Sequence, residues 1–519
     1  MTAAPHVPDV LETLAQLPND EVFTPPKVAN AVLDVLPADV WSQPSYRWLD
    51  PAAKSGVFLR EAAKRLMVGL SEWQPDSLKR LEHILKNMLY GAAITELSGE
   101  IVRRSLYQTK DATGTGLKDE SLRGLIVRFD KSEGNIRYVA TEHTLDRRGS
   151  ECVICRAPAG LVRERREHFA YSFTHKTYPT KEMHDMEFDV IVGNPPYQIG
   201  VEGNTRTKPI YQQFVLGAIA LAPKYVVMIT PSRWFTGGLG LDPFRRTMLS
   251  DRRLARVVDN PKLFDVFPQV EIKGGVSYFL WDRDHDGDCE FSTRIDGQIT
   301  STMRRDLREG RGVLVRSNQA GAIVSKVEAL NETTIEPRVS SQKPFGLLSN
   351  FDDFRNEPFE GSIRLYKRDR GDAWVDPSLV AQNHDLIDKW KVLTPEAADG
   401  HGRIPASVTG YPFVVGPGSV CTQTFLVAGT FEDQRTAENY ACYLRTRFAR
   451  FLVHQRKSSQ HTTSETYRFV PDVPYDRVWT DEDLYELFGL TEDEVAYIES
   501  QVKAVDESEP VVDAGAEEE

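Results

Sequence analysis

The stretch FDVIVGNPPYQ, residues 188–198, joins a strand-like apolar run to a polar corner that a hydrophobic core does not require. The apolar run stops at Asn194, and the two prolines that follow, Pro195 and Pro196, lack a backbone donor and leave carbonyl oxygens exposed. Asn194 adds a side-chain carbonyl and Tyr197 an aromatic face. Acceptors beside a ring suit a planar amine, such as the exocyclic amino group of adenine or cytosine. A rigid structural turn is the alternative interpretation.

Around this stretch, from about residue 22 to residue 281, strand-like and helix-like segments alternate, which is typical of an α/β fold with a mostly parallel sheet. The segments with strand character are 46–50, 89–94, 188–193, 224–230, 252–259 and 274–281. The segments with helical spacing are 28–37, 57–70, 78–89, 96–107 and 209–222. The last strand, 274–281, follows its predecessor without a long helix, so we expect it to be an antiparallel edge strand.

The length of 519 residues predicts two or three domains. We expect an N-terminal extension, a catalytic domain interrupted by an insertion, a C-terminal mixed α/β domain, two short helices that begin with capping boxes, and an acidic disordered tail. The corresponding ranges are 1–20, 21–290 with the insertion at about 108–187, 300–475, 476–505 and 506–519.

The composition, 40% hydrophobic and 27% charged, is that of a globular protein. Five scattered cysteines and the lack of a signal-like N-terminus or a long apolar run predict a cytoplasmic protein with no membrane partner. The formal net charge is −13, but the segments 304–312, 363–371 and 444–457 are locally basic. Local basic segments are compatible with DNA binding, because phosphate contacts are local, although they can equally be solvated faces.

A second strand end, WLDPAAKSGVFL at residues 48–59, places an acidic residue and a small-residue turn directly before a helix. Ligands in open parallel sheets bind at the carboxyl ends of strands, so this turn is a candidate cradle for a polar cofactor. It can also be a plain tight connection.

Taken together, the two strand ends and their order resemble the gamma class of S-adenosylmethionine-dependent DNA methyltransferases, which methylate N6 of adenine in bacterial restriction–modification systems. EVFTPPKVANAVLDVL at 21–36 resembles the N-terminal cofactor segment of that family, DPAAKSGVFL its cofactor loop, and NPPY its catalytic motif. The resemblance covers residues 20–280 and implies a Rossmann-like sheet with helices on both faces, followed by a target-recognition domain.

The resemblance assigns catalysis to Asn194, Pro195, Pro196 and Tyr197. It assigns S-adenosylmethionine binding to Phe23, Thr24, Pro25, Asp50, Ala52, Ser55, Gly56, Phe58, Thr95, Glu96, His175 and Asn194. His175 is included because 171–177 is expected to be a strand that presents it to the adenine ring of the cofactor. Two departures stand out. Lys54 replaces the first glycine of the loop, and Ala93 stands where a ribose-binding carboxylate is usual, with Glu96 or Thr95 as substitutes.

The mechanism that the resemblance implies requires the adenine to leave the double-stranded DNA and stack on Tyr197. Its amino protons would be accepted by Asn194 Oδ1 and the Pro195 carbonyl, and Phe214 or Trp234 would form the opposite wall. Basic residues of the second domain are the candidates for DNA contacts. They are Arg364, Lys367, Arg368, Arg370, Arg445, Arg447, Arg450, Arg456 and Lys457.

The first alternative is a methyltransferase of RNA or of protein amides, and the second is a nuclease or a methyltransferase–nuclease fusion. Two further alternatives are a DNA-specificity subunit with a decayed active site and a methyltransferase subunit that works with a separate restriction endonuclease. The segment QVEIK at 269–273, with Asp259 or Asp265 upstream, superficially matches a nuclease motif, and we interpret it as coincidental.

Cys152 and Cys155 have the spacing of half a zinc knuckle. No second CxxC exists, so further ligands would have to be histidines such as His143, His168 or His175. A structural zinc ion and unligated thiols are both compatible with the sequence.

Overall fold

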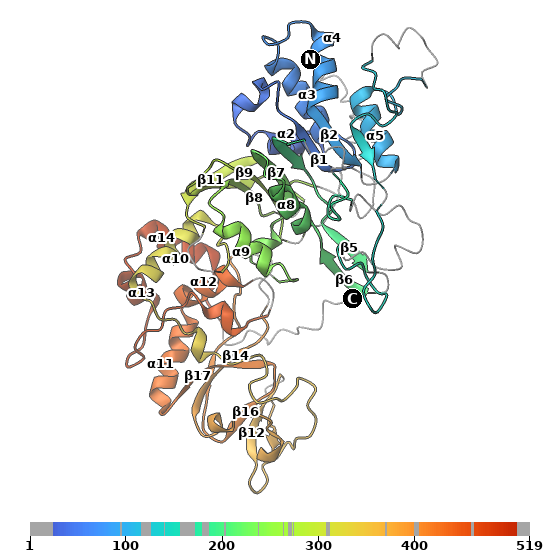
Figure 1. Cartoon of the computed structure of the whole chain (residues 1–519). Helices are drawn as coiled ribbons and strands as arrows, with labels where there is room; N and C mark the ends of the chain where they lie inside the picture. Colours follow the sequence, from blue (N-terminus) through green and yellow to red (C-terminus); the bar gives the residue numbers. More distant parts are fainter. Residues whose placement is uncertain are drawn as a thin grey trace, which may run out of the picture. The chain divides into compact units, whose positions relative to one another are not determined.

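The structure is a computed structural model of the whole chain, shown in Figure 1. The residues that it describes are 24–93, 96–115, 126–139, 141–155, 172–178, 186–201, 204–236, 238–262, 264–267, 272, 274–307, 312–368, 371–398, 404–457 and 461–505. The chain divides into two compact units, Met1–Leu314 and Val315–Glu519. None of the described helices is both long and apolar enough to cross a membrane.

The first unit is built on a sheet whose nine described strands run in the order β11-β10-β8-β9-β7-β4-β1-β2-β3. Their bounds are β1 Trp48–Ala53, β2 Leu89–Ala93, β3 Ile136–Tyr138, β4 Val190–Gly193, β7 Tyr225–Pro231, β8 Leu254–Asn260, β9 Val276–Asp282, β10 Cys289–Ile295 and β11 Gln298–Arg305. β7, β4, β1, β2 and β3 are parallel to one another, as the alternating pattern predicts. The carboxyl ends of β4 and β1 are therefore neighbours.

Three features of this sheet differ from the prediction. β9 is antiparallel, as expected, but it lies between β7 and β8 rather than at an edge, with Phe279 opposite both Met228 and Val257. The antiparallel edge is β11, which pairs with β10, so the sheet continues to Arg305, beyond the boundary expected at residue 290. The third difference is β3, an edge strand contributed by the expected insertion.

Apolar side chains alternate along the strands and so build one core on each face of the sheet. On β1, for example, Trp48 belongs to one core and Leu49 to the other. The first core packs against helices α2 (Pro26–Leu33), α3 (Val57–Gly69) and α5 (Glu96–Tyr107). The second packs against α8 (Tyr211–Ala220) and α9 (Asp242–Ser250). Helices therefore cover both faces, as the Rossmann-like expectation requires.

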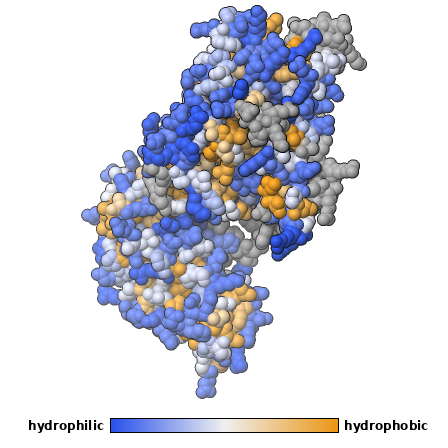
Figure 2. Space-filling view, viewed as in Figure 1, coloured by the Kyte–Doolittle hydropathy of each residue, from blue (hydrophilic) through white to orange (hydrophobic). Residues whose placement is uncertain are grey.

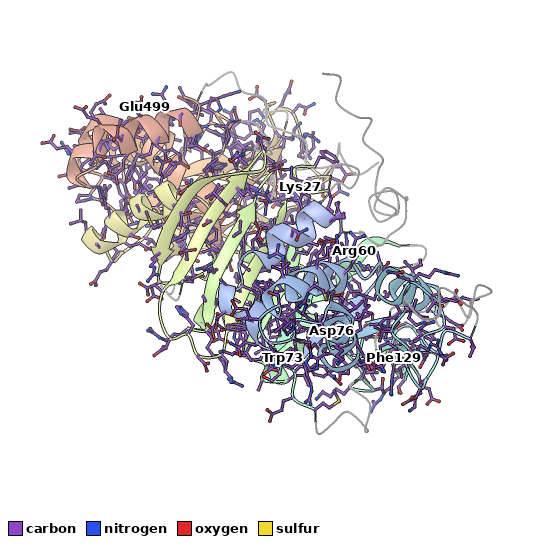
Figure 3. The ribbon with its side chains drawn as sticks, turned by 90° about the horizontal axis from the view of Figure 1, so that it is seen from above. Lys27, Arg60, Trp73, Asp76, Phe129 and Glu499 are labelled. Atoms are coloured by element: carbon purple, nitrogen blue, oxygen red, sulfur yellow. The ribbon has the colours of Figure 1, made fainter. Side chains whose placement is uncertain are left out.

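Short-range chemistry explains where individual helices begin. Helix α4 (Ser77–His83) starts at Asp76, whose carboxylate accepts hydrogen bonds from the backbone N–H groups of Leu78 and Lys79. The indole of Trp73, close to Asp76 in Figure 3, packs against His83 with the ring centres 4.5 Å apart. A π-helix, Ile84–Met88, then leads directly into β2.

Strand β4 is followed, after the Asn194–Tyr197 corner, by a two-stranded hairpin of β5 (Gln198–Val201) and β6 (Asn204–Pro209). Helix α8 begins two residues later. Figure 2 shows a mostly hydrophilic face with a hydrophobic area over α8, and Leu216 of this helix is 37% exposed.

The described residues of the second unit form two three-stranded sheets, in the orders β13-β12-β16 and β15-β14-β17, with helices packed beside them. The strands are β12 Ile363–Tyr366, β13 Trp374–Val375, β14 Trp390–Pro395, β15 Phe413–Val415, β16 Ser419–Cys421 and β17 Phe425–Phe431. The α-helices are α10 Asn318–Leu330, α11 Gln434–Arg445, α12 Arg447–Arg456, α13 Asp481–Leu487 and α14 Glu492–Gln501. The two predicted capping boxes are present, between Thr480 and Asp483 and between Thr491 and Glu494.

Candidate functional site

The loop after β1 forms one side of the site. Asp50 lies within β1, is 3% exposed, and accepts a hydrogen bond of 3.1 Å from the backbone N–H of Ala52. Gly56 caps helix α3 with φ +75°, a conformation that residues with a Cβ rarely adopt. A Cβ there would lie 2.8 Å from Cγ1 of Val102 on α5. Glycine at this position therefore lets α5 pack directly against the loop, where Ser105 also donates to the Ser55 carbonyl.

The Asp50 carboxyl titrates near neutrality. Burial raises its pKa from 3.8 to about 7, and the hydrogen bond from Ala52 and the positive charge of Lys54 only partly oppose this effect. A buried carboxyl with such a pKa is poised to receive a cation, because a cation favours the ionised form.

The end of β4 forms the other side of the site. Asn194 is 4% exposed, and its Nδ2 donates a hydrogen bond of 2.9 Å to Thr24 Oγ1, which sets the orientation of the amide. The preceding residue, Gly193, contacts the neighbouring strand so closely that a Cβ would lie 2.9 Å from Asp50 Oδ1. Gly193 was not assigned a role from the sequence; a glycine at a strand end, directly before the polar corner, was the available signal.

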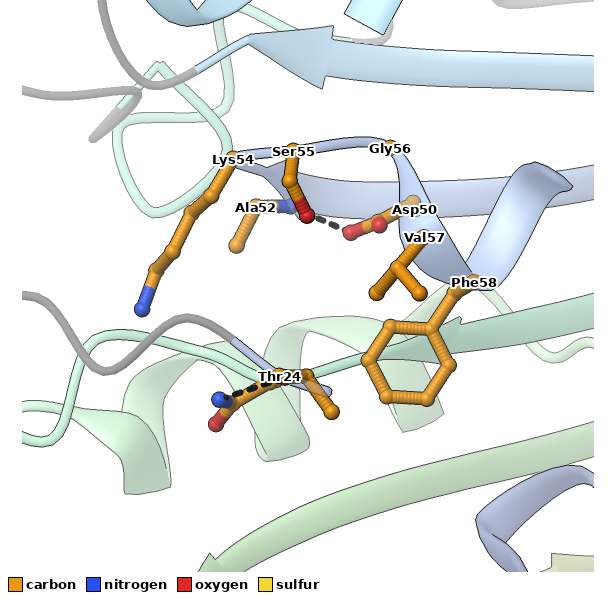
Figure 4. A pocket seen from close by; sticks show the side chains of 9 residues that line it. Thr24, Asp50, Ala52, Lys54, Ser55, Gly56, Val57 and Phe58 are labelled. Carbon is orange, nitrogen blue, oxygen red and sulfur yellow. Dashed lines mark hydrogen bonds between the residues drawn. The ribbon is translucent and has the colours of Figure 1, made fainter. Parts of the chain in front are cut away.

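The two strand ends line a single pocket (Figure 4). Its lining residues are Thr24, Asp50, Ala52, Lys54, Ser55, Gly56, Val57, Phe58 and Asn194. The pocket thus brings together most of the residues assigned to the cofactor and adds Lys54 and Val57. The pocket offers a buried carboxylate, a buried cation, two hydroxyl groups and an aromatic ring. These groups fit the chemistry of S-adenosylmethionine, which carries an ammonium, a carboxylate and a sulfonium group.

Several predicted cofactor residues lie elsewhere. Pro25 is the N-cap of helix α2 and does not line the pocket. Glu96 is the first residue of α5 and is exposed, so its expected contact with ribose stays a prediction. Ala93 is fully buried at the end of β2. Phe23 and Thr95 lie outside the described residues.

Tyr197 is less accessible than its predicted stacking role requires. The residue is 7% exposed and belongs to the first core. Burial raises the pKa of its phenol well above the ordinary value, and the Asn194 side chain acts in the opposite direction. The Tyr197 carbonyl accepts from the Ile210 N–H, which connects the corner to the residue before α8.

The two aromatic residues expected to form the opposite wall are core residues. Phe214 is 1% exposed and stacks on Phe173 with ring centres 5.9 Å apart. Trp234 is fully buried against Phe235 and Phe244. Both expectations are wrong for the structure as it stands, because neither ring faces solvent or the pocket.

A second cluster lies among the side chains of the second core. It consists of His143, Cys152, Cys155 and His175, called here the Cys/His group, whose four candidate ligand atoms all lie within 4.8 Å of one another. His175 was expected in a strand beside the cofactor, but residues 172–176 form a turn that places it in this group. Burial and the nearby His143 lower the pKa of His175 to about 4, so its imidazole is neutral at pH 7. His168, the other predicted ligand, lies outside the described residues.

The predicted DNA contacts in the second unit separate into exposed and buried residues. Arg364 on β12 has a 42% exposed side chain and forms an ion pair with Asp372, and Lys367 lies over the ring of Phe354. Arg368 is also described, whereas Arg370 is not. The exposed side chain of Arg364 in particular is accessible to a phosphate.

The buried residues of this set have structural partners instead. Arg450 is 1% exposed and donates to the Lys503 carbonyl, so its assignment to DNA is wrong. The side chain of Arg456 is 8% exposed and forms an ion pair with Glu465, which also contradicts a DNA contact. Lys457 donates to the Val408 carbonyl. Helical periodicity in 444–457 places these side chains toward neighbouring elements, which a count of basic residues does not detect.

The other basic residues of 444–457 also have partners within the unit. Arg445 donates to the Pro412 carbonyl and lies over the ring of Tyr411. Arg447 forms an ion pair of 3.7 Å with Glu499. Of the nuclease-like match that we interpret as coincidental, residues 269–271 and 273 lie outside the described residues. Asp259 is fully buried and accepts a hydrogen bond from Ser232.

Two comparisons relate the chain to known methylases. The family model of the Eco57I restriction-modification methylases matches residues 87–267. An uncharacterized adenine-specific methylase of Mycoplasma pneumoniae (strain ATCC 29342 / M129 / Subtype 1) is 33% identical over 342 residues, which cover 61% of this chain and 80% of that protein.

Solved structures give weaker likenesses. The type IIL restriction-modification enzyme MmeI in complex with DNA has a TM-score of 0.42 and 11% identity, covering 91% of this chain and 74% of that one. A modification subunit of a putative type I restriction enzyme from Vibrio vulnificus YJ016 has a TM-score of 0.33 and 18% identity. The likeness covers 53% of this chain but only 47% of the Vibrio chain.

Proposed function

Because this chain belongs to a family of adenine-specific methylases and its residues 87–267 match the Eco57I restriction-modification methylases, we propose that it transfers the methyl group of S-adenosylmethionine to N6 of an adenine in double-stranded DNA. The observation that supports this most strongly is the shared pocket, which is lined both by Asp50 of β1 and by Asn194, the residue directly after β4. A cofactor held by Asp50 would present its reactive group to a base held by Asn194.

The residues of the pocket fit the two ends of the methionine moiety. The Asp50 carboxylate would pair with the ammonium group, and Lys54 would attract the carboxylate. Ser55 and Thr24 offer hydroxyl groups, and Phe58 offers an apolar face to the sulfonium side. When bound, S-adenosylmethionine supplies an electrophilic methyl group.

The chemical step needs an adenine amino group oriented toward that methyl group. Asn194 Oδ1 and the Pro195 carbonyl would accept the two N6 protons, which favours a pyramidal nitrogen with its lone pair directed at the methyl carbon. The bond between N6 and the methyl carbon would form as the bond between that carbon and sulfur breaks, and the surplus proton on nitrogen would pass to water. No general base is needed, because the methylated ammonium product is a strong acid.

The base must leave the double helix to reach Asn194, which costs a few kcal/mol. Stacking on Tyr197 would offset part of this cost, as would local phosphate contacts through exposed residues such as Arg364. Since Tyr197 is 7% exposed, the side chains that cover it must move aside when a base enters. We propose that the second unit recognises the target sequence, and that a separate restriction endonuclease is the functional partner.

The test is transfer of tritiated methyl groups to double-stranded DNA of mixed sequence, with RNA and protein as parallel acceptors. We expect label in DNA for the wild-type chain and none for Asn194→Ala. The matched control is Asn87→Ala, an exposed asparagine of the same unit, which should leave transfer unchanged. Label confined to RNA or protein would support the alternative methyltransferases and overturn the proposal.

A further inference from the structure

The Cys/His group has the composition and the geometry of a metal site. We propose that it binds one structural zinc ion, which fastens two segments of the insertion onto the face of the sheet that carries α8. This inference does not depend on the proposed methyltransferase function.

The distances within the group match tetrahedral coordination. Sγ of Cys155 lies 3.2 Å from Nδ1 of His143, and Sγ of Cys152 lies 3.6 Å from Nε2 of His175. A tetrahedral zinc ion with Zn–S of about 2.3 Å and Zn–N of about 2.0 Å separates its sulfur and nitrogen ligands by about 3.5 Å. The four donors therefore already surround a space of the right size.

The donor set selects the metal and its role. Two thiolates and two imidazoles in a tetrahedral arrangement are typical of zinc, whereas magnesium and calcium require oxygen ligands. Four protein ligands leave no coordination position for water, which characterises a structural site. The backbone N–H of Ile154 also lies 3.5 Å from Cys152 Sγ, a contact that stabilises a thiolate.

The position of the group indicates what the metal would hold together. His143, Cys152 and Cys155 lie on a small hairpin closed by the bridge between Leu145 and Cys152, and His175 lies in the separate turn at 172–176. Each segment is short, and neither contains enough apolar residues for a core of its own. A metal that links them contributes its binding free energy directly to their folding.

Both segments of the Cys/His group contact elements that follow the corner after β4. Phe173, two residues before His175, stacks on Phe214 of α8 and contacts Gly217. Glu151, next to Cys152, forms an ion pair of 2.7 Å with Lys208 of β6, in the hairpin after Tyr197. The metal would therefore stabilise the surroundings of the site without contacting its pocket.

The decisive experiment measures zinc in the full-length chain, purified under reducing conditions without a metal-affinity tag, by elemental mass spectrometry. We expect one zinc per wild-type chain and less than a tenth of that for Cys152→Ser and Cys155→Ser. Cys442→Ser, which alters a partly exposed cysteine of the second unit, should retain one zinc.

If the variants do not fold, the wild-type chain still decides the question. X-ray absorption should give two sulfur and two nitrogen ligands, and cobalt substitution should give the intense visible bands of a tetrahedral thiolate complex. A folded, reduced wild-type chain without bound metal that fails to take up added zinc would overturn the proposal, as would a zinc shell made of oxygen ligands.

Discussion

Gly193 and Asp50, 143 positions apart in the sequence, are in such close contact that a Cβ on Gly193 would lie 2.9 Å from Asp50 Oδ1. The contact joins the strand that leads to Asn194 to the strand that carries the buried carboxyl. The parallel pairing of β1 with β4 makes it possible, since both strands end at the same edge of the sheet. The proposed cofactor site and the proposed base site therefore share this contact.

Replacing Gly193 with alanine should disturb its contact with Asp50. The added methyl group must displace the Asp50 carboxylate, so we expect binding of S-adenosylmethionine to weaken by about tenfold, or about 1.4 kcal/mol. Isothermal titration calorimetry measures the change. Gly287→Ala is the control, because its Cβ would meet nothing closer than 3.4 Å. Equal affinity in the two variants would contradict the claim that the Gly193–Asp50 contact supports cofactor binding.

The pKa of Asp50, about 7 in the folded chain, predicts a pH dependence of cofactor binding. The ammonium of the cofactor pairs with the ionised carboxyl, so affinity should rise about tenfold per pH unit below 7 and level off above it. Titrations between pH 5.5 and 8 test this. Asp50→Asn should bind more weakly, with a flat profile over that range, and a flat wild-type profile would contradict the assignment.

The raised pKa of Asp50 also predicts a pH dependence of the free energy of unfolding, which runs opposite to that of cofactor binding. The carboxyl has an ordinary pKa of 3.8 and a folded-state pKa of about 7, so the folded state holds more protons between these values. The free energy of unfolding of the free chain should therefore fall as pH rises from about 4 to 7, by roughly 4 kcal/mol at most. Asp50→Asn removes this contribution, so denaturant titrations should show a smaller decrease for the variant than for the wild type.

Lys54, which lines the pocket, predicts a distinct ligand selectivity. If its ammonium attracts the carboxylate of the cofactor, Lys54→Met should weaken S-adenosylmethionine about tenfold and leave its decarboxylated analogue unaffected or bound more tightly. Lys64→Met is the control, because Lys64 pairs with Glu61 on α3 and is 61% exposed. Equal losses for both ligands would show that Lys54 acts only through loop geometry.

The two classes of arginine in the second unit should respond differently to alanine substitution. Arg364→Ala should reduce DNA affinity and lower the slope of its salt dependence by about 0.9, with little effect on stability. The exposed Arg435 is a control of equal charge. Arg450→Ala should instead lower the free energy of unfolding by about 2–4 kcal/mol, since it leaves a cavity and an unpaired Lys503 carbonyl.

The parts of the fold that could be predicted are those encoded by local pattern. The strands at 46–50, 89–94, 188–193 and 224–230 correspond to β1, β2, β4 and β7, because apolar runs bounded by turn residues specify buried strands. Strand order is not local, so the place of β9 between β7 and β8 was not accessible from the pattern. Asp50 and Asn194 could be assigned together because the carboxyl ends of parallel strands meet at one edge.

The predictions that failed concern residues whose positions depend on burial or on partners distant in the sequence. His175 looked like a strand residue, but its place is fixed by contacts with a hairpin more than 20 residues away. Arg450 looked like a DNA contact because charge is visible in a sequence, whereas the neighbours that bury it are not. Tyr197 was expected to be accessible, and its burial follows from core packing around the corner.

The central claim is methylation of adenine in DNA by Asn194 and its neighbours, and nucleoside mass spectrometry tests it most directly. Unmethylated DNA would be incubated with S-adenosylmethionine and the wild-type chain or Asn194→Ala, digested to nucleosides and analysed. We predict N6-methyladenine only with the wild-type chain. Methylated cytosine instead, or equal N6-methyladenine with both proteins, would contradict the claim.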